Sequence, residues 1–189
     1  MPSVSLQRWH NDRLPRLVAI HWQCHHCLAA VPANPQLADE NLRGYVVLLS
    51  AHFQAFCREL YTECAQIIAS KVRPSLQLLI QTQFSANRSL NHGNPNTENI
   101  AKDFNRFGLD INKELDADPA NTLRRQYLAT LNKWRNVAAH QSTPTPAAGP
   151  LSLPLLQTWR GACDGLAISI EAIMYNQLRR TLRRAPWVP

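Results

Sequence analysis

The spacing of apolar residues along the chain predicts helices almost throughout, because these residues recur every three to four positions rather than every second position. The most persistent pattern runs from Leu37 to Val72, where the apolar side chains fall on one continuous face. A segment of this length is typical of the central helix of a bundle. The apolar face comprises Leu42, Tyr45, Val46, Leu49, Phe53, Phe56, Leu60 and Ile67.

Shorter periodic segments lie on both sides of this helix, and proline-rich or polar loops separate them. Strand patterns are nearly absent, so we expect an all-α bundle of five to six helices with one long spine helix. A single domain should span residues 1–189, with a core at about 37–182, a helical N-terminal extension at 1–36 and a flexible tail at 183–189. The expected helices are 14–31, 37–72, 74–90, 97–107, 119–140 and 153–182, with a loop at 89–97.

Composition narrows the class of protein. Hydrophobic residues make up 45% of the chain and charged residues 17%, which favours a globular protein over a disordered one. The first residues are polar and lack the apolar region of a signal peptide, and no apolar run is long enough for a membrane span. We therefore expect a cytoplasmic protein without a membrane partner. Twenty Lys and Arg against 13 Asp and Glu give a net charge of +7, which favours polyanionic partners.

The helix expected at 119–140 carries the densest candidate chemistry, in the segment KWRNVAAHQ at 133–141. Asp118 should cap this helix and Pro119 should occupy its first turn. At about 100° per residue, Asn136 and His140 share one face, whereas Arg135 lies at the margin of the apolar side. An arginine there must extend to solvent, pair with an acid, or project into a cleft or interface. The side predicted to face the core comprises Leu123, Tyr127, Leu128, Leu131, Trp134 and Ala138.

Two interpretations of this segment remain open at the level of residues. One is a solvated polar face with a single arginine that extends to solvent. The other is a phosphodiester-cleaving site, since a guanidinium can stabilise a pentacoordinate phosphorus and an imidazole can transfer protons near neutral pH. The small residues at 137–139 would let a substrate or another helix approach closely.

The run RNVAAH at 135–140 resembles the Arg-x4-6-His motif of HEPN domains, which also have a polar residue directly after the arginine. The long helix around GYVVLLSAHFQAFCREL is similar to the N-terminal helix of the RiboL-PSP-like branch of that superfamily. The resemblance covers about residues 37–182. It implies an all-α fold and a metal-independent endoribonuclease that needs no cofactor, commonly a toxin of a toxin–antitoxin pair or an antiphage effector.

The resemblance also implies roles for individual residues. His140 would act as general acid or base, Arg135 would bind the phosphate, and Asn136 would orient the scissile phosphate or hold its neighbour. The 2′-hydroxyl of the RNA would attack the adjacent phosphorus and leave a 2′,3′-cyclic phosphate. HEPN nucleases place two motifs at a shared cleft, so a homodimer is expected.

Two positions depart from family patterns. Some HEPN toxins carry a tyrosine two positions after the histidine, which a partner nucleotidyltransferase modifies, whereas this chain has Ser142 there. An antitoxin or nucleotidyltransferase partner is possible, but it would find no tyrosine to modify at this position. Related branches also place an acid in the middle of the long helix, where this chain has Gln54, with Glu59 about a turn away. Which side chain orients Arg135 is thus left open.

Basic residues near the motif offer contacts to an RNA backbone. Lys133, Arg124 and Arg125 lie on the same helix as the motif and are candidate RNA-binding residues. The alternative is that these basic side chains are only solvated surface residues. A non-catalytic HEPN module that binds RNA, a nucleotide or a partner protein, and a plain helical adaptor, are the alternatives to the nuclease.

The segment HWQCHHC at 21–27 is a second dense cluster. His21, Cys24, His25 and Cys27 have same-face helical spacings that could hold Zn²⁺, but no second pair of ligands follows at the spacing of a zinc finger. We expect these residues to be structural and predict no metal site. Cys57, Cys64 and Cys163 are expected in the core, and an odd number of five cysteines argues against a disulfide framework.

Overall fold

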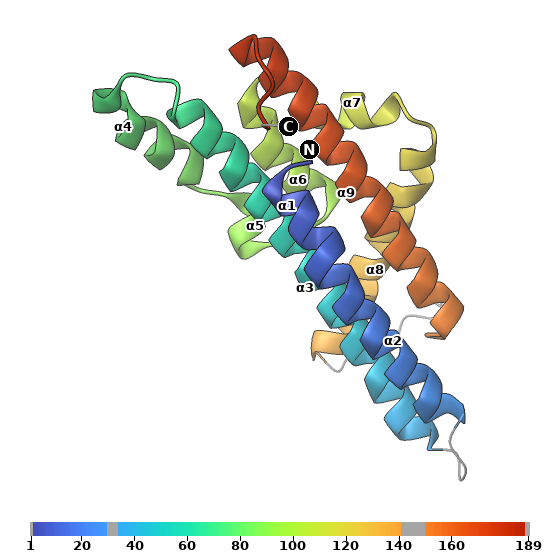
Figure 1. The fold of residues 1–189 in the computed structure, drawn as a ribbon. Coiled ribbons are helices and arrows are strands. Elements are labelled where there is room, and N and C mark those ends of the chain that lie inside the picture. Colours follow the sequence, from blue (N-terminus) through green and yellow to red (C-terminus); the bar gives the residue numbers. More distant parts are fainter. Residues whose placement is uncertain (1, 30–33, 141–149, 188–189) are drawn as a thin grey trace.

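The computed structural model describes residues 2–29, 34–140 and 150–187, and every regular element within these ranges is a helix (Figure 1). The predicted all-α fold with one long spine helix is confirmed. The spine, α3 (Pro35–Ala69), packs against α8 (Ala120–His140) and α9 (Leu153–Leu182), which also pack against each other. None of the helices in the described ranges has the length and apolar character needed to cross a membrane.

Helix α3 begins two residues earlier than predicted. The Asn34 side chain accepts a hydrogen bond from the Leu37 backbone N–H at 3.0 Å, and Pro35 follows in the first turn, where its missing N–H costs nothing. The helix ends at Ala69 rather than Val72. Its predicted apolar face is buried except at Ile67, which is half-buried. This face supplies the centre of the hydrophobic core.

The N-terminal segment is helical from Val4, so the predicted start at Leu14 was wrong. Helix α1 (Val4–Arg8), a π-helical turn at Trp9–Arg13 and α2 (Leu14–Ala29) follow one another directly. Leu6 and Trp9 are buried in the same core cluster as the spine helix. The Trp9 indole N–H donates to Asp164 Oδ1 at 2.9 Å. The N-terminal segment is therefore packed into the core of the bundle.

Short helices connect α3 to α8. Helix α4 (Pro74–Ser85) ends before the predicted Leu90, and the chain then turns at Asn87, which has a φ of 51°. The predicted loop at 89–97 contains a short helix, α5 (Ser89–His92). Helix α6 (Thr97–Phe104) is capped by Asn96 rather than Thr97 and continues into a 3-10 turn at Asn105–Phe107. The remaining connection holds α7 (Ile111–Asp116), which was not predicted.

The C-terminal segment is packed at least as far as Trp187. Helix α9 ends where Arg183 adopts a left-handed conformation, with a φ of 54°. The chain then folds back, and Trp187 is buried with its ring centroid 6.3 Å from that of Tyr175. Within the predicted tail, Trp187 thus has an indole that is buried against α9.

Candidate functional site

Helix α8 positions the motif, and it is fixed by a cap at its start and by a buried face. At the start, Asp118 Oδ1 accepts a hydrogen bond from the Ala120 backbone N–H at 3.0 Å, as the predicted cap requires. Leu128, Leu131 and Trp134 are buried, so this face anchors the helix in the core. The prediction for Leu123 was wrong, since that side chain is 51% exposed. Two of the predicted core positions, 127 and 138, are half-buried.

The three motif side chains lie in the last two turns of this helix. Arg135 is half-buried, whereas Asn136 and His140 are exposed. Arg135 Nη1 donates to Asn136 Oδ1 at 3.3 Å, and no acid among the described residues pairs with the Arg135 guanidinium. The guanidinium thus donates to a neutral amide, and no carboxylate in the described ranges neutralises its positive charge. His140 is the last residue of α8, and Ser142 lies outside the described residues.

A loop between α5 and α6 holds the Asn136 side chain. Asn94 Nδ2 donates to Asn136 Oδ1 at 2.8 Å, so the same oxygen accepts from Arg135 and from Asn94. Asn99 Nδ2 donates in turn to the Asn94 carbonyl at 2.9 Å. Because its oxygen is engaged twice, Asn136 can offer its amide NH₂ group to a phosphate oxygen.

The spine helix fixes this loop against α8. Gln54 Nε2 donates to the carbonyls of Leu90 at 2.6 Å and Gly93 at 2.8 Å. One turn earlier, Ser50 Oγ donates to Asn132 Oδ1 at 3.4 Å, and Asn132 Nδ2 donates to the Pro95 carbonyl at 3.3 Å. Gln54 therefore holds the loop that carries Asn94, and Asn94 in turn contacts Asn136 of the motif.

The side chain that orients Arg135 is Asn136 rather than a residue of α3. Glu59 is occupied elsewhere, because it pairs with Arg8 at 3.2 Å and with Arg13. Gln54 donates to backbone carbonyls of the loop. Neither Gln54 nor Glu59 of α3 thus contacts the Arg135 guanidinium, and Asn136 is the side chain that does.

The contacts of Asn94 and Asn132 were not predicted from the sequence. For Asn132, however, the sequence held a usable indication. Ser50 and Asn132 are both buried, at 2% and 6% exposure, and both interrupt apolar faces of their helices. Buried polar side chains need partners, so two such interruptions on neighbouring helices indicate that they bond to each other. No comparable signal marks Asn94, which lies in a loop rich in asparagine.

The basic pair at the start of α8 is engaged within the protein. Arg124 Nη1 donates to Asp118 Oδ2 at 3.0 Å and to Asn121 Oδ1 at 2.9 Å, and Arg125 pairs with Asp116. Arg124 also lies against Gly165 of α9, where any Cβ would clash with its guanidinium. Arg124 is about 24 Å from His140 along the helix axis. Lys133 is exposed and lies two residues before Arg135 on the same helix.

The cluster at 21–27 is divided between different environments. His21 and Cys24 are buried, His25 is exposed, and Cys27 Sγ accepts from Asn41 Nδ2 at 3.3 Å. His21 Nε2 lies 3.1 Å from Gln157 Nε2. Three or more His, Cys, Asp or Glu side chains do not converge as metal ligands anywhere in the described ranges. The structure thus gives these four residues packing and hydrogen-bonding contacts.

The cysteines predicted in the core are there. Cys57, Cys64 and Cys163 are buried and free. Burial raises the pKa of each of these thiols above its ordinary value, which keeps them protonated. A protonated, inaccessible thiol is a poor nucleophile, so these three cysteines are core residues rather than candidates for catalysis.

Replacing Gln54 tests the support that α3 gives to the loop. Gln54→Ala removes two hydrogen bonds, and we expect the free energy of unfolding to fall by about 1–3 kcal/mol. Gln54→Glu should be more damaging, because a carboxylate would face two carbonyl oxygens. Denaturant unfolding would measure both, with Gln66→Ala, an exposed position on the same helix, as control. Equal stability of all three variants would contradict the support by Gln54.

Comparison with known proteins gives a family match and no closer relative. The family model described as RiboL-PSP-HEPN matches residues 26–174, which run from the last turn of α2 through most of α9. The match includes the long helix, the loop that carries Asn94 and the whole motif. No curated protein and no solved structure matches the chain significantly.

Proposed function

The chain belongs to the RiboL-PSP-HEPN family, and from this premise we propose that it is a metal-independent endoribonuclease whose site is Arg135, Asn136 and His140. The observation that carries the proposal is the state of Arg135, a half-buried cation held by an amide and paired with no acid in the described ranges. An arginine buried for structural reasons would be expected to pair with an acid. A purely solvated arginine would not need a partner such as Asn136, whose side-chain oxygen is fixed by a second hydrogen bond from Asn94.

The proposed reaction needs few protein groups because RNA supplies its own nucleophile. An imidazole of His140 takes the proton of a ribose 2′-hydroxyl, whose oxygen attacks the adjacent phosphorus. Arg135 stabilises the negative charge of the pentacoordinate phosphorus, and the NH₂ group of Asn136 donates to one of its oxygens. The bond to the 5′-oxygen breaks, and that oxygen takes up a proton. The products are a 2′,3′-cyclic phosphate and a 5′-hydroxyl.

The reaction requires both a base and an acid, but each motif contains one imidazole. We propose that two chains form a homodimer across a two-fold axis, so that two motifs line one groove and supply both groups. Sedimentation or light scattering at micromolar concentration should give a mass of two chains. Replacing the exposed Lys133 with Glu should weaken the dimer, whereas Lys71→Glu, at an exposed position just after the end of the spine helix, should not. A fully active monomer would contradict this assembly.

Replacing Arg135 should impair both binding and catalysis. We expect Arg135→Ala to reduce RNA affinity and also the cleavage rate at saturating RNA, because the cation acts in the ground state and in the transition state. Arg135→Lys should recover little if both N–H groups of the fork contact the phosphate. Asn136→Ala should lie between Arg135→Ala and wild type. Single-turnover kinetics and filter binding would measure the two effects separately, and a normal rate in Arg135→Ala would exclude its role.

The biological role that we propose is that of a cytoplasmic toxin or antiphage effector held in check by an antitoxin or nucleotidyltransferase partner. A site that cuts RNA without a metal ion would be harmful to the cell that makes it, so a partner that blocks the motif is expected. The neighbouring gene tests this directly, since its product should suppress cleavage when mixed with this protein.

A further inference from the structure

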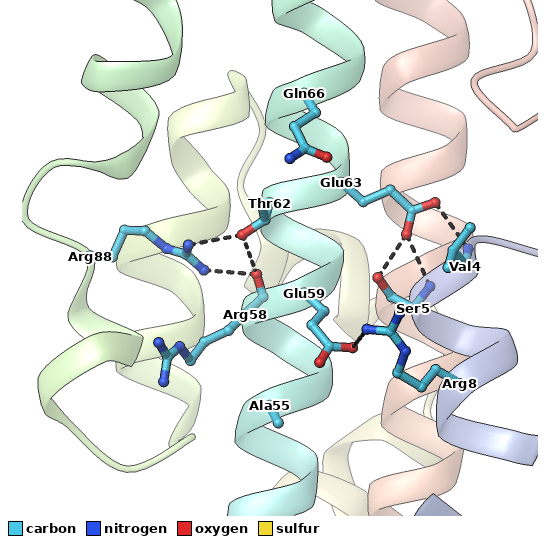
Figure 2. Close-up of a pocket in the computed structure, with 10 residues that line it drawn as sticks. All are labelled: Val4, Ser5, Arg8, Ala55, Arg58, Glu59, Thr62, Glu63, Gln66 and Arg88. Atoms are coloured by element: carbon cyan, nitrogen blue, oxygen red, sulfur yellow. Dashed lines mark hydrogen bonds and ion pairs between the residues drawn. The ribbon is translucent and has the colours of Figure 1, made fainter. Parts of the chain in front are cut away.

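A polar groove lies over the spine helix, away from the motif. It has a volume of about 550 Å³ and lies between α1 on one side and the segment that begins at Arg88 on the other (Figure 2). Pockets of this size accommodate small-molecule ligands. The lining residues used below are Arg8, Arg58, Glu59, Thr62, Glu63 and Arg88.

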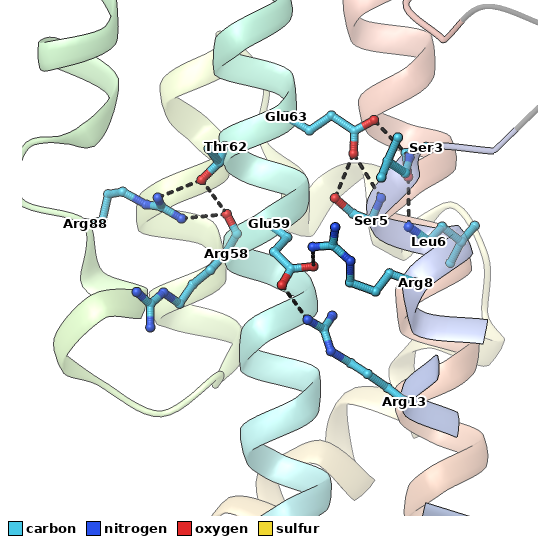
Figure 3. Close-up of polar contacts among 11 residues, drawn as sticks. Ser3, Ser5, Leu6, Arg8, Arg13, Arg58, Glu59, Thr62, Glu63 and Arg88 are labelled. Atoms are coloured by element: carbon cyan, nitrogen blue, oxygen red, sulfur yellow. Dashed lines mark hydrogen bonds and ion pairs between the residues drawn. The ribbon is translucent and has the colours of Figure 1, made fainter. Parts of the chain in front are cut away.

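Both acids in this groove are engaged by groups of the protein itself (Figure 3). Glu63 accepts hydrogen bonds from the backbone N–H groups of Val4 and Ser5, each at 3.0 Å, and from the Ser5 hydroxyl at 2.7 Å. It therefore occupies the donors at the start of α1. Glu59 pairs with Arg8 and with the buried Arg13. Neither carboxylate is left to neutralise the other two arginines.

Arg88 is a buried cation with neutral partners. It is 9% exposed, and its guanidinium donates to the Thr62 hydroxyl at 3.0 Å and to the Arg58 carbonyl at 2.8 Å. Its guanidinium carbon lies 4.4 Å from the centre of the Tyr61 ring, and its Nε has no hydrogen-bond partner. Burial lowers the pKa of Arg88 from its ordinary value. These contacts fix the orientation of the side chain. No acid in the described ranges lies at ion-pair distance from its guanidinium, although the nearby Asp103 carboxylate favours its charged form.

Arg58 adds a second uncompensated cation. Its side chain is exposed at the groove and forms no ion pair with the residues that the structure describes. Three arginines thus line the groove, at 8, 58 and 88, against two glutamates that are already engaged within the protein. Arg58 and Arg88 have no acid at ion-pair distance in the described ranges, so both can contact an anion in the groove.

We propose that this groove binds a small molecule through a diphosphate group. Guanidinium groups bind phosphate oxygens in pairs of parallel hydrogen bonds, and a diphosphate can contact Arg58 and Arg88 with one phosphate and Arg8 with the other. The site does not depend on the ribonuclease proposal. Residues 4, 5 and 8 precede residue 26, where the family match begins, so the N-terminal segment of this chain completes the groove.

Calorimetric titration of the full chain with inorganic pyrophosphate tests the site. Wild type should bind one equivalent per chain, and Arg58→Gln should bind at least tenfold more weakly. Arg58 forms no ion pair within the described ranges, so its loss should not unfold the protein. The matched control is Arg73→Gln, which removes an equally exposed positive charge outside the groove and should leave binding unchanged.

Three further outcomes sharpen the test. Arg8→Gln should weaken binding with no change in helical content, and His140→Ala should bind pyrophosphate as wild type does even if RNA cleavage is lost. Succinate, which has two carboxylates, should bind more weakly than pyrophosphate. The proposal is overturned if wild type shows no saturable binding, if Arg73→Gln weakens binding as much as Arg58→Gln, or if succinate binds more tightly.

Discussion

His140→Ala should reduce the rate of RNA cleavage by roughly 10²–10⁴-fold, the usual contribution of a proton-transfer group. The affinity for RNA should change little, because Arg135 and Asn136 remain in place to contact the phosphate. The thermal stability should also be unchanged, since His140 is exposed at the last position of α8. Single-turnover cleavage, RNA binding and thermal melting would measure the three quantities on the same preparation.

The control for this variant is His26→Ala, which removes another exposed imidazole at the end of α2 and should leave cleavage unchanged. Two results would contradict the catalytic role of His140. If wild type binds RNA but does not cut it, the protein is a binding module that keeps the motif for recognition. If His140→Ala lowers stability while the folded fraction cuts normally, His140 has a structural role.

A single 2′-deoxyribose on the 5′ side of the scissile phosphate should abolish cleavage at that bond. The substitution removes the nucleophile itself, so no arrangement of protein groups can compensate for it. A short RNA with one known cut site would be compared with the same RNA carrying the deoxyribose there or at the next nucleotide. Only the first substitution should block the reaction. Normal cleavage of that RNA would mean that water or a protein group is the nucleophile.

The periodic spacing of apolar residues was sufficient to predict the long helices. The spine helix and the motif helix were placed within a few residues, because each buries a continuous face over many turns and the pattern is therefore strong. The position of Arg135 at the margin of the apolar face was also predictable, since the helical angle alone fixes it. The candidate site could thus be found before its surroundings were known.

Other features depend on contacts that no local pattern reveals. The hydrogen bond between Asn94 and Asn136 joins residues 42 positions apart, and it exists only because α3 holds the intervening loop in place. Leu123 lies on the core side of its helix by angle, but the turn contacts α9 through Asn121 and Arg124 instead, and Leu123 remains 51% exposed. A helical pattern gives the direction of a side chain and not the presence of a partner.

The start of the N-terminal helical segment at Val4 was not predicted, for a related reason. Leu6 and Trp9 stand among polar residues, and the hydrogen bond from Trp9 to Asp164 of α9 makes their burial possible. Such a pattern is too short and too mixed to predict an amphipathic helix. The groove with Arg88 was hidden in the same way, because it forms only where this segment packs beside α3.

The most direct test of the proposed activity is to incubate the purified wild-type protein with RNA in excess EDTA and to identify the 3′ ends of the products. The proposed mechanism predicts cleavage at an undiminished rate and 2′,3′-cyclic phosphate ends, because the 2′-hydroxyl is the nucleophile and Arg135 is the stabilising cation. Loss of cleavage in EDTA, restored by a divalent ion, or products that carry 3′-hydroxyl ends would contradict it.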